Sequence, residues 1–123
     1  MVIDSNIIIA YLGGDKDIIS LLTTWKRDGF SLFLPTIVES EVLSFSKLTP
    51  NEMRITERFI EETFTSIPFE RYIARVTAEI RRNVNIKFPD AAIAATGIFT
   101  KTPVVTRNRK DFQRVPTLRI IVP

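Results

Sequence analysis

The chain contains neither cysteine nor histidine among its 123 residues. The lack of cysteine excludes disulfides, thiol nucleophiles and metal sites with thiolate ligands. The lack of histidine excludes histidine general bases, Ser-His triads and histidine-based zinc sites. Any metal ion in this protein must therefore be held by oxygen ligands, which favours Mg²⁺, Mn²⁺ or Ca²⁺.

The chain also lacks an apolar run of about 18 residues, the length that a membrane-spanning helix needs. Its first residues show no basic leader followed by a small-residue cleavage site, so we expect no secretory signal, no membrane association and a cytoplasmic location. The length predicts one domain covering residues 1–123. The formal net charge of +3 is compatible with a polyanionic partner, although charge alone does not distinguish a nucleic-acid-binding protein from other basic proteins.

Short apolar segments alternate with helical patterns along the whole chain, which predicts an α/β fold. The segments that we expect to form strands are residues 2–3, 30–34, 64–67, 103–106 and 118–122. The segments between them carry apolar residues at helical spacing, as in the stripe of a helix that packs on a sheet. This alternation indicates a parallel sheet whose strands are joined by right-handed crossovers.

The first residues place an acid at the end of the first expected strand. Val2 and Ile3 are apolar and β-branched, and Asp4-Ser5-Asn6 leads from them into an apolar helix. Open α/β sheets bind their ligands at the carboxyl ends of the strands. Taken alone, Asp4 would be interpreted as a turn residue, and a site requires that other acids converge on it.

Glu41 is the second acid of interest, in a helix predicted to begin at Thr36. The sequence Thr36-Ile-Val-Glu39 fits a capping box, which would explain Glu39 as part of a helix N-terminus. Glu41 has no such explanation and lies on or beside the apolar face, where a carboxylate is costly unless it is paired or bound to a metal ion. A structural ion pair and a metal ligand are both compatible with its position.

Asp90 is the third acid, in the first turn of a helix that continues with Ala91-Ala92-Ile93-Ala94-Ala95. Small apolar residues on nearly every side indicate a central helix that packs closely on its neighbours. An acid in a first turn also interacts favourably with the helix dipole, so capping alone is an alternative explanation.

If Asp4, Glu41 and Asp90 converge, their mutual repulsion favours a divalent cation between them. Such a cation polarises a phosphoryl oxygen and lowers the pKa of water, so no side-chain nucleophile is needed. The polar residues that would orient the carboxylates are Asn6, Thr106 and Asn108. The sequence therefore predicts metal-dependent phosphodiester hydrolysis, on the assumption that the acids meet in space.

The helix predicted from about residue 70 to 85 carries an arginine stripe. Arg71, Arg75 and Arg82 share one face, with Arg81 beside them. An ordinary solvated surface would have the same pattern. The functional alternative is a face that follows the phosphates of a nucleic acid, with Arg75 and Arg82 as RNA-binding residues.

Four motifs, in this order along the chain, resemble those of the PIN-domain nucleases and, more narrowly, the VapC-type toxins of type II toxin–antitoxin systems. They are Val2-Ile-Asp-Ser-Asn6, Glu41-Val-Leu43, Phe88-Pro-Asp-Ala-Ala-Ile-Ala-Ala-Thr96 and Val105-Thr-Arg-Asn-Arg-Lys-Asp-Phe112. No motif is specific alone, but the four together are, and they span nearly the whole chain.

The resemblance implies a three-layer α/β/α sandwich with a central parallel sheet. It implies an endoribonuclease that needs Mg²⁺ or Mn²⁺ and cuts RNA, commonly tRNA or rRNA. It also implies a homodimer that a cognate antitoxin inhibits by covering the acidic groove. The family's acids correspond to Asp4, Glu41 and Asp90, and its supporting positions to Asn6 and Thr106.

Two positions depart from the family pattern. Asn108 occupies a place where the family often has a fourth acid, and Asp111 lies one helical turn further on. Because an amide is a weaker metal ligand than a carboxylate, one metal ion with Asn108 in support is favoured over two, and either Asn108 or Asp111 completes the site. Phe45 replaces a glycine that the family often has four residues after its helix glutamate, which would reshape the groove.

Two other functions are compatible with an α/β sheet edged by acids. A signalling receiver domain needs adjacent acids after the first strand and an aspartate at the end of the third, whereas Ser5 follows Asp4 here and Pro68 ends the third expected strand. A non-catalytic PIN-like RNA-binding module would use the arginine stripe and would not depend on Asp90.

Overall fold

The computed structural model describes all residues from Met1 to Pro123. The five strands are β1 (Val2–Ile3), β2 (Phe33–Pro35), β3 (Thr65–Ile67), β4 (Val104–Val105) and β5 (Ile120–Ile121). The seven helices are α1 (Ser5–Leu12), α2 (Lys16–Arg27), α3 (Thr36–Leu43), α4 (Pro50–Thr63), α5 (Arg71–Asn83), α6 (Phe88–Thr100) and α7 (Arg109–Phe112).

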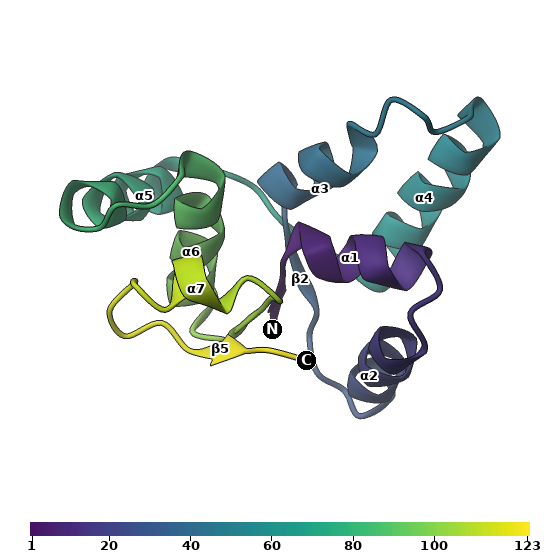
Figure 1. Cartoon of the computed structure of the whole chain (residues 1–123), viewed down its shortest axis with the longest axis horizontal. Coiled ribbons are helices and arrows are strands. Elements are labelled where there is room, and N and C mark those ends of the chain that lie inside the picture. The colour runs from purple at the N-terminus through teal and green to yellow at the C-terminus, as the bar shows by residue number, and fades with distance from the viewer.

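All neighbouring strands of the sheet are parallel, in the order β3-β2-β1-β4-β5. Figure 1 shows α1, α2 and α4 on one side of the sheet and α5, α6 and α7 on the other. This arrangement is what right-handed crossovers produce when the strand order reverses direction, here between β1 and β4. The predicted α/β fold with a central parallel sheet between helical layers is confirmed, and its strand order changes direction beside Asp4.

The centre of the fold is built from β-branched strands and one helix of small residues. Every residue of β1 and β4 is fully buried, as expected for parallel strands that helices cover on both faces. Helix α6 is buried from Ala91 to Gly97. A Cβ atom at Gly97 would lie 2.9 Å from the Val104 side chain, so only glycine allows this approach. The predicted close packing of this helix is therefore confirmed.

Side chains cap the N-termini of α2 and α4 but not that of α3. Asp15 caps α2, and Thr49 and Glu52 form both hydrogen bonds of a capping box in α4. The capping box predicted at Thr36 is wrong, because α3 begins at Thr36 itself, after Pro35, and no side chain caps it. The Thr36 hydroxyl instead accepts a hydrogen bond from the backbone N–H of Phe69, at 3.3 Å.

Strand β2 starts three residues later than the apolar pattern predicts. Gly29 has a positive φ of 86°, and the turn that it makes leaves Phe30 53% exposed, outside the sheet. Strand β1 has its predicted bounds, and β3, β4 and β5 lie within their predicted segments and are shorter. None of the helices combines the length and the apolar composition that crossing a membrane requires.

Candidate active site

Asp4 lies at the end of β1 and is the N-cap of α1, with only 4% of its surface exposed. Its Oδ1 accepts a hydrogen bond from the Ser5 backbone N–H at 2.7 Å. Its Oδ2 accepts from the Thr106 hydroxyl at 2.7 Å and from the Asn6 Nδ2 at 2.9 Å. Burial raises the pKa of Asp4, and these hydrogen bonds offset only part of the rise. The carboxylate is thus held by neutral donors.

Thr106 follows β4, and its hydrogen bond to Asp4 links the ends of β4 and β1, where the strand order changes direction. It is fully buried, and its hydroxyl, which donates to Asp4, also accepts from Asn6 Nδ2 at 3.2 Å and from the Asn108 backbone N–H at 2.9 Å. The Asn108 side chain then donates to Asp111 Oδ2 at 2.9 Å. The four supporting residues predicted from the sequence therefore form one hydrogen-bonded chain that begins at Asp4.

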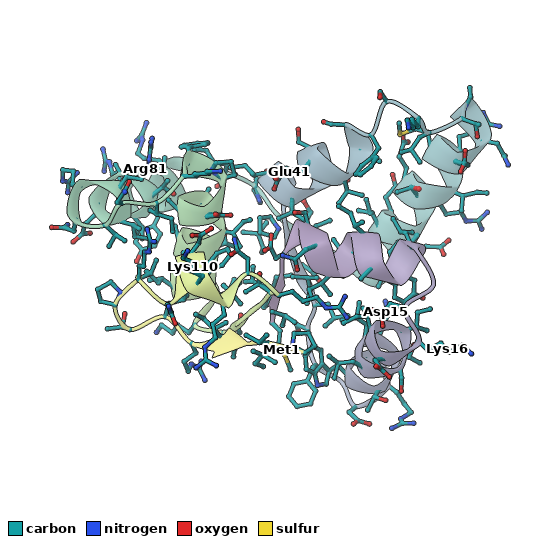
Figure 2. The ribbon with its side chains drawn as sticks, in the orientation of Figure 1. Met1, Asp15, Lys16, Glu41, Arg81 and Lys110 are labelled. Carbon is teal, nitrogen blue, oxygen red and sulfur yellow. The ribbon has the colours of Figure 1, made fainter.

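Glu41 and Asp90 come from different helices, and the charge of Asp4 acts on both. Burial raises the pKa of Glu41, and the charges of Asp4 and Asp90 raise it further. Burial also raises the pKa of Asp90, with further increases from Asp4 and Asp111 and a smaller opposite effect from Lys87. Figure 2 shows Glu41 on α3, where this helix approaches α6. The three predicted acids share one electrostatic environment.

The ion pair that would explain Glu41 is absent, whereas Asp90 lies in the first turn of α6, where the helix dipole favours an acid. The three ion pairs of the structure use Asp15, Asp28 and Glu62 as their acids. No side chain makes a capping hydrogen bond at the N-terminus of α6, so Asp90 is not a cap. Glu41 is exposed beside the buried Val38 and Val42, so it lies next to the apolar face and is not part of it. Neither acid is paired with a cation.

No group of three or more acidic side chains in the structure is arranged to enclose a metal ion. This geometry excludes a preformed cage of protein ligands. Mg²⁺ does not require such a cage, because it keeps several water molecules and is usually bound by one or two carboxylates together with substrate phosphates. The oxygen-only side chains and the repulsion among the acids fit a hydrated Mg²⁺ or Mn²⁺ ion.

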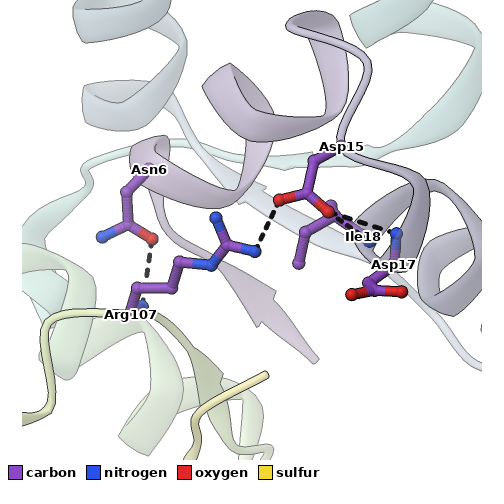
Figure 3. A network of polar contacts seen from close by, with 5 residues as sticks. All are labelled: Asn6, Asp15, Asp17, Ile18 and Arg107. Atoms are coloured by element: carbon purple, nitrogen blue, oxygen red, sulfur yellow. Dashed lines mark hydrogen bonds and ion pairs between the residues drawn. The ribbon is translucent and has the colours of Figure 1, made fainter.

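Arg107 is a residue at this edge that the sequence analysis did not select. Its backbone N–H donates to Asn6 Oδ1 at 3.1 Å, and its guanidinium donates to Asp15 Oδ2 at 2.7 Å (Figure 3). The contact with Arg107 lowers the pKa of Asp15. Only the position of Arg107 between Thr106 and Asn108 was visible in the sequence, and its partner lies 92 residues away.

Arg75 and Arg82 lie on α5 and are both solvent-accessible. Their neighbour Arg81 stacks over Phe88, with 5.9 Å from its Cζ atom to the ring centroid. Figure 2 shows Arg81 on the flank of the molecule away from α1. A role of Arg75 and Arg82 in RNA binding stays a prediction.

The charge of an acid at the switch point of a parallel sheet thus acts on acids of two neighbouring helices, and the comparison with known families agrees with this arrangement. Residues 1–118 match the PIN domain family. The chain belongs to the PIN domain family. The resemblance seen in the four motifs is therefore confirmed, and the match includes every predicted site residue of this PIN domain.

Two curated relatives of this PIN domain are ribonucleases. It is 27% identical to the Rickettsia bellii (strain RML369-C) protein named ribonuclease VapC, over 98% of this chain and 94% of the relative. It is 26% identical to ribonuclease VapC1 of Rickettsia felis, with the same coverage. The predicted similarity to VapC-type proteins is confirmed at this level of identity.

Solved structures with the same fold include a toxin–antitoxin complex. A toxin–antitoxin complex from Klebsiella pneumoniae superposes with a TM-score of 0.81 and 29% identity, over 99% of this chain and 96% of that chain. VapBC2 from Rickettsia felis, solved with a DNA fragment from its promoter, has a TM-score of 0.85 at 20% identity, over 98% and 96% of the two chains. The second similarity supports the fold alone.

Proposed function

We propose that this PIN domain is an endoribonuclease toxin of a toxin–antitoxin pair that hydrolyses RNA phosphodiester bonds with the help of Mg²⁺ or Mn²⁺. The observation that supports it most strongly is that the charge of Asp4 acts on both Glu41 and Asp90, while none of the three acids belongs to an ion pair. Burial raises the pKa of all three acids, and the charge of Asp4 raises the pKa of Glu41 and Asp90 further. Such an arrangement is costly for the fold and useful for holding a cation. The ribonuclease VapC relatives support RNA as the substrate.

In this proposal Asp4 and Asp90 hold the cation, and Glu41 completes the acidic site. A bound Mg²⁺ would neutralise the carboxylates, polarise a phosphoryl oxygen and lower the pKa of water. Thr106 and Asn6 fix the Asp4 carboxylate by hydrogen bonds to Oδ2. Glu41 is open to solvent and has a raised pKa, so its carboxylate is suited to accept a proton from the attacking water.

The fourth corner of the site is formed by Asn108 and Asp111. Because the Asn108 side chain donates to Asp111, its amide nitrogen is committed to this contact. The charge of Asp111 raises the pKa of Asp90, and Asp111 is the carboxylate available at this corner. We infer that Asn108 orients Asp111 and that one metal ion is held on the side of Asp4 and Asp90.

The partners that we propose are RNA, a cognate antitoxin and a second copy of the chain. The antitoxin is supported by the Klebsiella pneumoniae complex, which is similar over nearly the whole chain. We also propose a cytoplasmic location, where a ribonuclease meets tRNA and rRNA. Sequencing RNA ends after induced expression would identify the target RNA.

Cleavage of total tRNA by the purified protein, with Mg²⁺ or with EDTA, tests the proposal. We expect cleavage only with Mg²⁺, and at least a roughly hundredfold loss in Asp4→Asn and Asp90→Asn, since several kcal/mol of charge stabilisation is removed. Asp17→Asn is the matched control, because Asp17 lies in the first turn of α2 and belongs to no ion pair. Circular dichroism would verify that each variant is folded.

The same assay separates the proposal from the alternative, a non-catalytic PIN-like RNA-binding module. Cleavage that persists in EDTA would contradict the metal-dependent mechanism. RNA binding without cleavage, unchanged in Asp90→Asn, would support the binding module.

A further inference from the structure

The loop after β4 is tied to the start of α2 by one residue, Arg107. Figure 3 shows its guanidinium reaching Asp15 and its backbone lying against Asn6. The guanidinium donates to Asp15 Oδ2 at 2.7 Å, and the backbone N–H donates to Asn6 Oδ1 at 3.1 Å. Arg107 therefore connects a residue outside the acidic site to a residue that touches Asp4.

The contact with the Arg107 backbone determines which way the Asn6 amide faces. With Oδ1 occupied by Arg107, Nδ2 is directed to Asp4 Oδ2 at 2.9 Å and to Thr106 Oγ1 at 3.2 Å. A reversed amide would place an oxygen against the Asp4 carboxylate, which has no hydrogen to donate when ionised. The position of the Arg107 N–H thus selects the amide orientation that supports Asp4.

Asp15 gives Arg107 a fixed anchor. Asp15 is the N-cap of α2, where its Oδ1 accepts from the backbone N–H groups of Asp17 at 3.1 Å and Ile18 at 3.2 Å. Its other oxygen remains for Arg107. The N-terminus of α2 fixes the Asp15 carboxylate, and this carboxylate in turn fixes Arg107 in the loop that follows Thr106.

We propose that Arg107 and Asp15 are positioning residues for the Asp4 carboxylate, acting through the Asn6 amide; the catalytic part of this inference rests on the proposed function. The pair is partly exposed, with 43% and 29% of its side chains accessible, and exposed ion pairs contribute little to stability. Its loss should therefore affect metal binding and turnover much more than folding.

The variants that test this are Arg107→Ala, Asp15→Asn and the double variant. Asparagine caps a helix as well as aspartate does, so Asp15→Asn removes the ion pair and keeps α2 intact. Arg107→Lys keeps a cation on the loop. Arg58→Ala is the matched control, because Arg58 makes a similar 2.8 Å ion pair with Glu62 on the surface of α4.

Three measurements apply to each variant: the Mn²⁺ dissociation constant by calorimetry, kcat and KM on total tRNA, and the NMR signals of the Asn6 side-chain amide. For Arg107→Ala and Asp15→Asn we expect Mn²⁺ binding weakened by about threefold to tenfold, below the 10–100-fold typical when a direct partner of a ligand is lost. kcat should fall with KM unchanged, and the Asn6 signals should shift. Arg107→Lys should recover part of each loss, and the double variant should be no worse than the worse single variant.

Wild-type values in both single variants, with unmoved Asn6 signals, would overturn the proposal. A higher KM with unchanged kcat would also overturn it, since Arg107 would then be an RNA contact. If the wild type neither binds Mn²⁺ nor cuts RNA, the proposed function fails, and the Asn6 signals alone decide the positioning role. A shift in Arg107→Ala but not in Arg58→Ala would support that role, and no shift would refute it.

Discussion

Asp4 and Asp15 have the same local position, since each is the N-cap of a helix, α1 or α2, and accepts hydrogen bonds from its first turn. Their surroundings differ. Asp15 is paired with Arg107, which lowers its pKa, whereas Asp4 is buried among neutral donors, which leaves its pKa raised. Capping explains both residues locally, and burial together with the lack of an ion pair separates the candidate metal ligand from the structural acid.

The contrast also shows how the fold distributes its charges. In this positively charged chain, ion pairs neutralise Asp15, Asp28 and Glu62, whereas Asp4, Glu41 and Asp90 belong to no ion pair. A group that stays uncompensated in a protein with an excess of cations is suited to an external cation. The predictions below test this difference, from the largest expected effect to the smallest.

Thr106→Val should have the largest effect, because it removes a buried hydroxyl on which Asp4, Asn6 and Asn108 depend. Leaving these groups unsatisfied should cost about 1–3 kcal/mol of unfolding free energy. Mn²⁺ affinity should fall by about 10–100-fold. Urea unfolding and calorimetry measure the two effects.

Thr96→Val is the control for this change. Thr96 is also buried, but its hydroxyl donates to the Ala92 carbonyl within α6 at 2.8 Å. Its replacement should leave Mn²⁺ binding unchanged. Equal losses of affinity in both variants would mean that general destabilisation, and not the support of Asp4, is responsible.

In the metal-free protein, Asp4 and Asp15 should make the free energy of unfolding depend on pH in opposite ways. A carboxyl whose pKa is raised by folding binds its proton more tightly in the folded state, so the unfolding free energy falls as pH rises from the ordinary value through the raised one. This applies to Asp4, Glu41 and Asp90. For Asp15 the pKa is lowered, so its contribution is present above the ordinary value and is lost as pH falls through the folded-state pKa.

Urea unfolding in EDTA between about pH 4 and pH 8 measures this dependence, since ordinary carboxyl pKa values lie near 4. Asp90→Asn should make the fall in stability with rising pH smaller. Mg²⁺ should stabilise the wild type most at the upper end of this range, where the acids are ionised. A stabilisation by Mg²⁺ that is independent of pH would contradict the assignment of these acids.

Arg75→Gln and Arg82→Gln should have the smallest effect on the fold, within about 0.5 kcal/mol, as is usual for surface positions. Each should weaken RNA binding and reduce the slope of log affinity against log salt by about 1, if each contacts a phosphate. Arg54→Gln, on the distant helix α4 (Figure 1), is the control. Unchanged slopes would identify the arginine stripe as a solvated face.

Much of the fold could be predicted because the signals are local. Apolar β-branched pairs mark β1 and β4, and the sequences at Asp15 and Thr49 mark helix starts through contacts within a few residues. The prediction failed at Thr36, where the same local pattern exists but Pro35 precedes the helix and the hydroxyl has a partner on another segment. A capping pattern competes with tertiary contacts that the sequence does not show.

The sequence by itself determined the chemistry that is available: an oxygen-only set of metal ligands, since cysteine and histidine are absent, and motifs typical of a PIN domain. The tertiary structure decided which groups surround each acid. It brings Thr106 to Asp4 across 102 residues and gives Arg107 to Asp15 and not to Asp4. The physical reason is the range of the interactions, because hydrogen bonds and charges act over a few ångströms in space, whatever the distance along the chain.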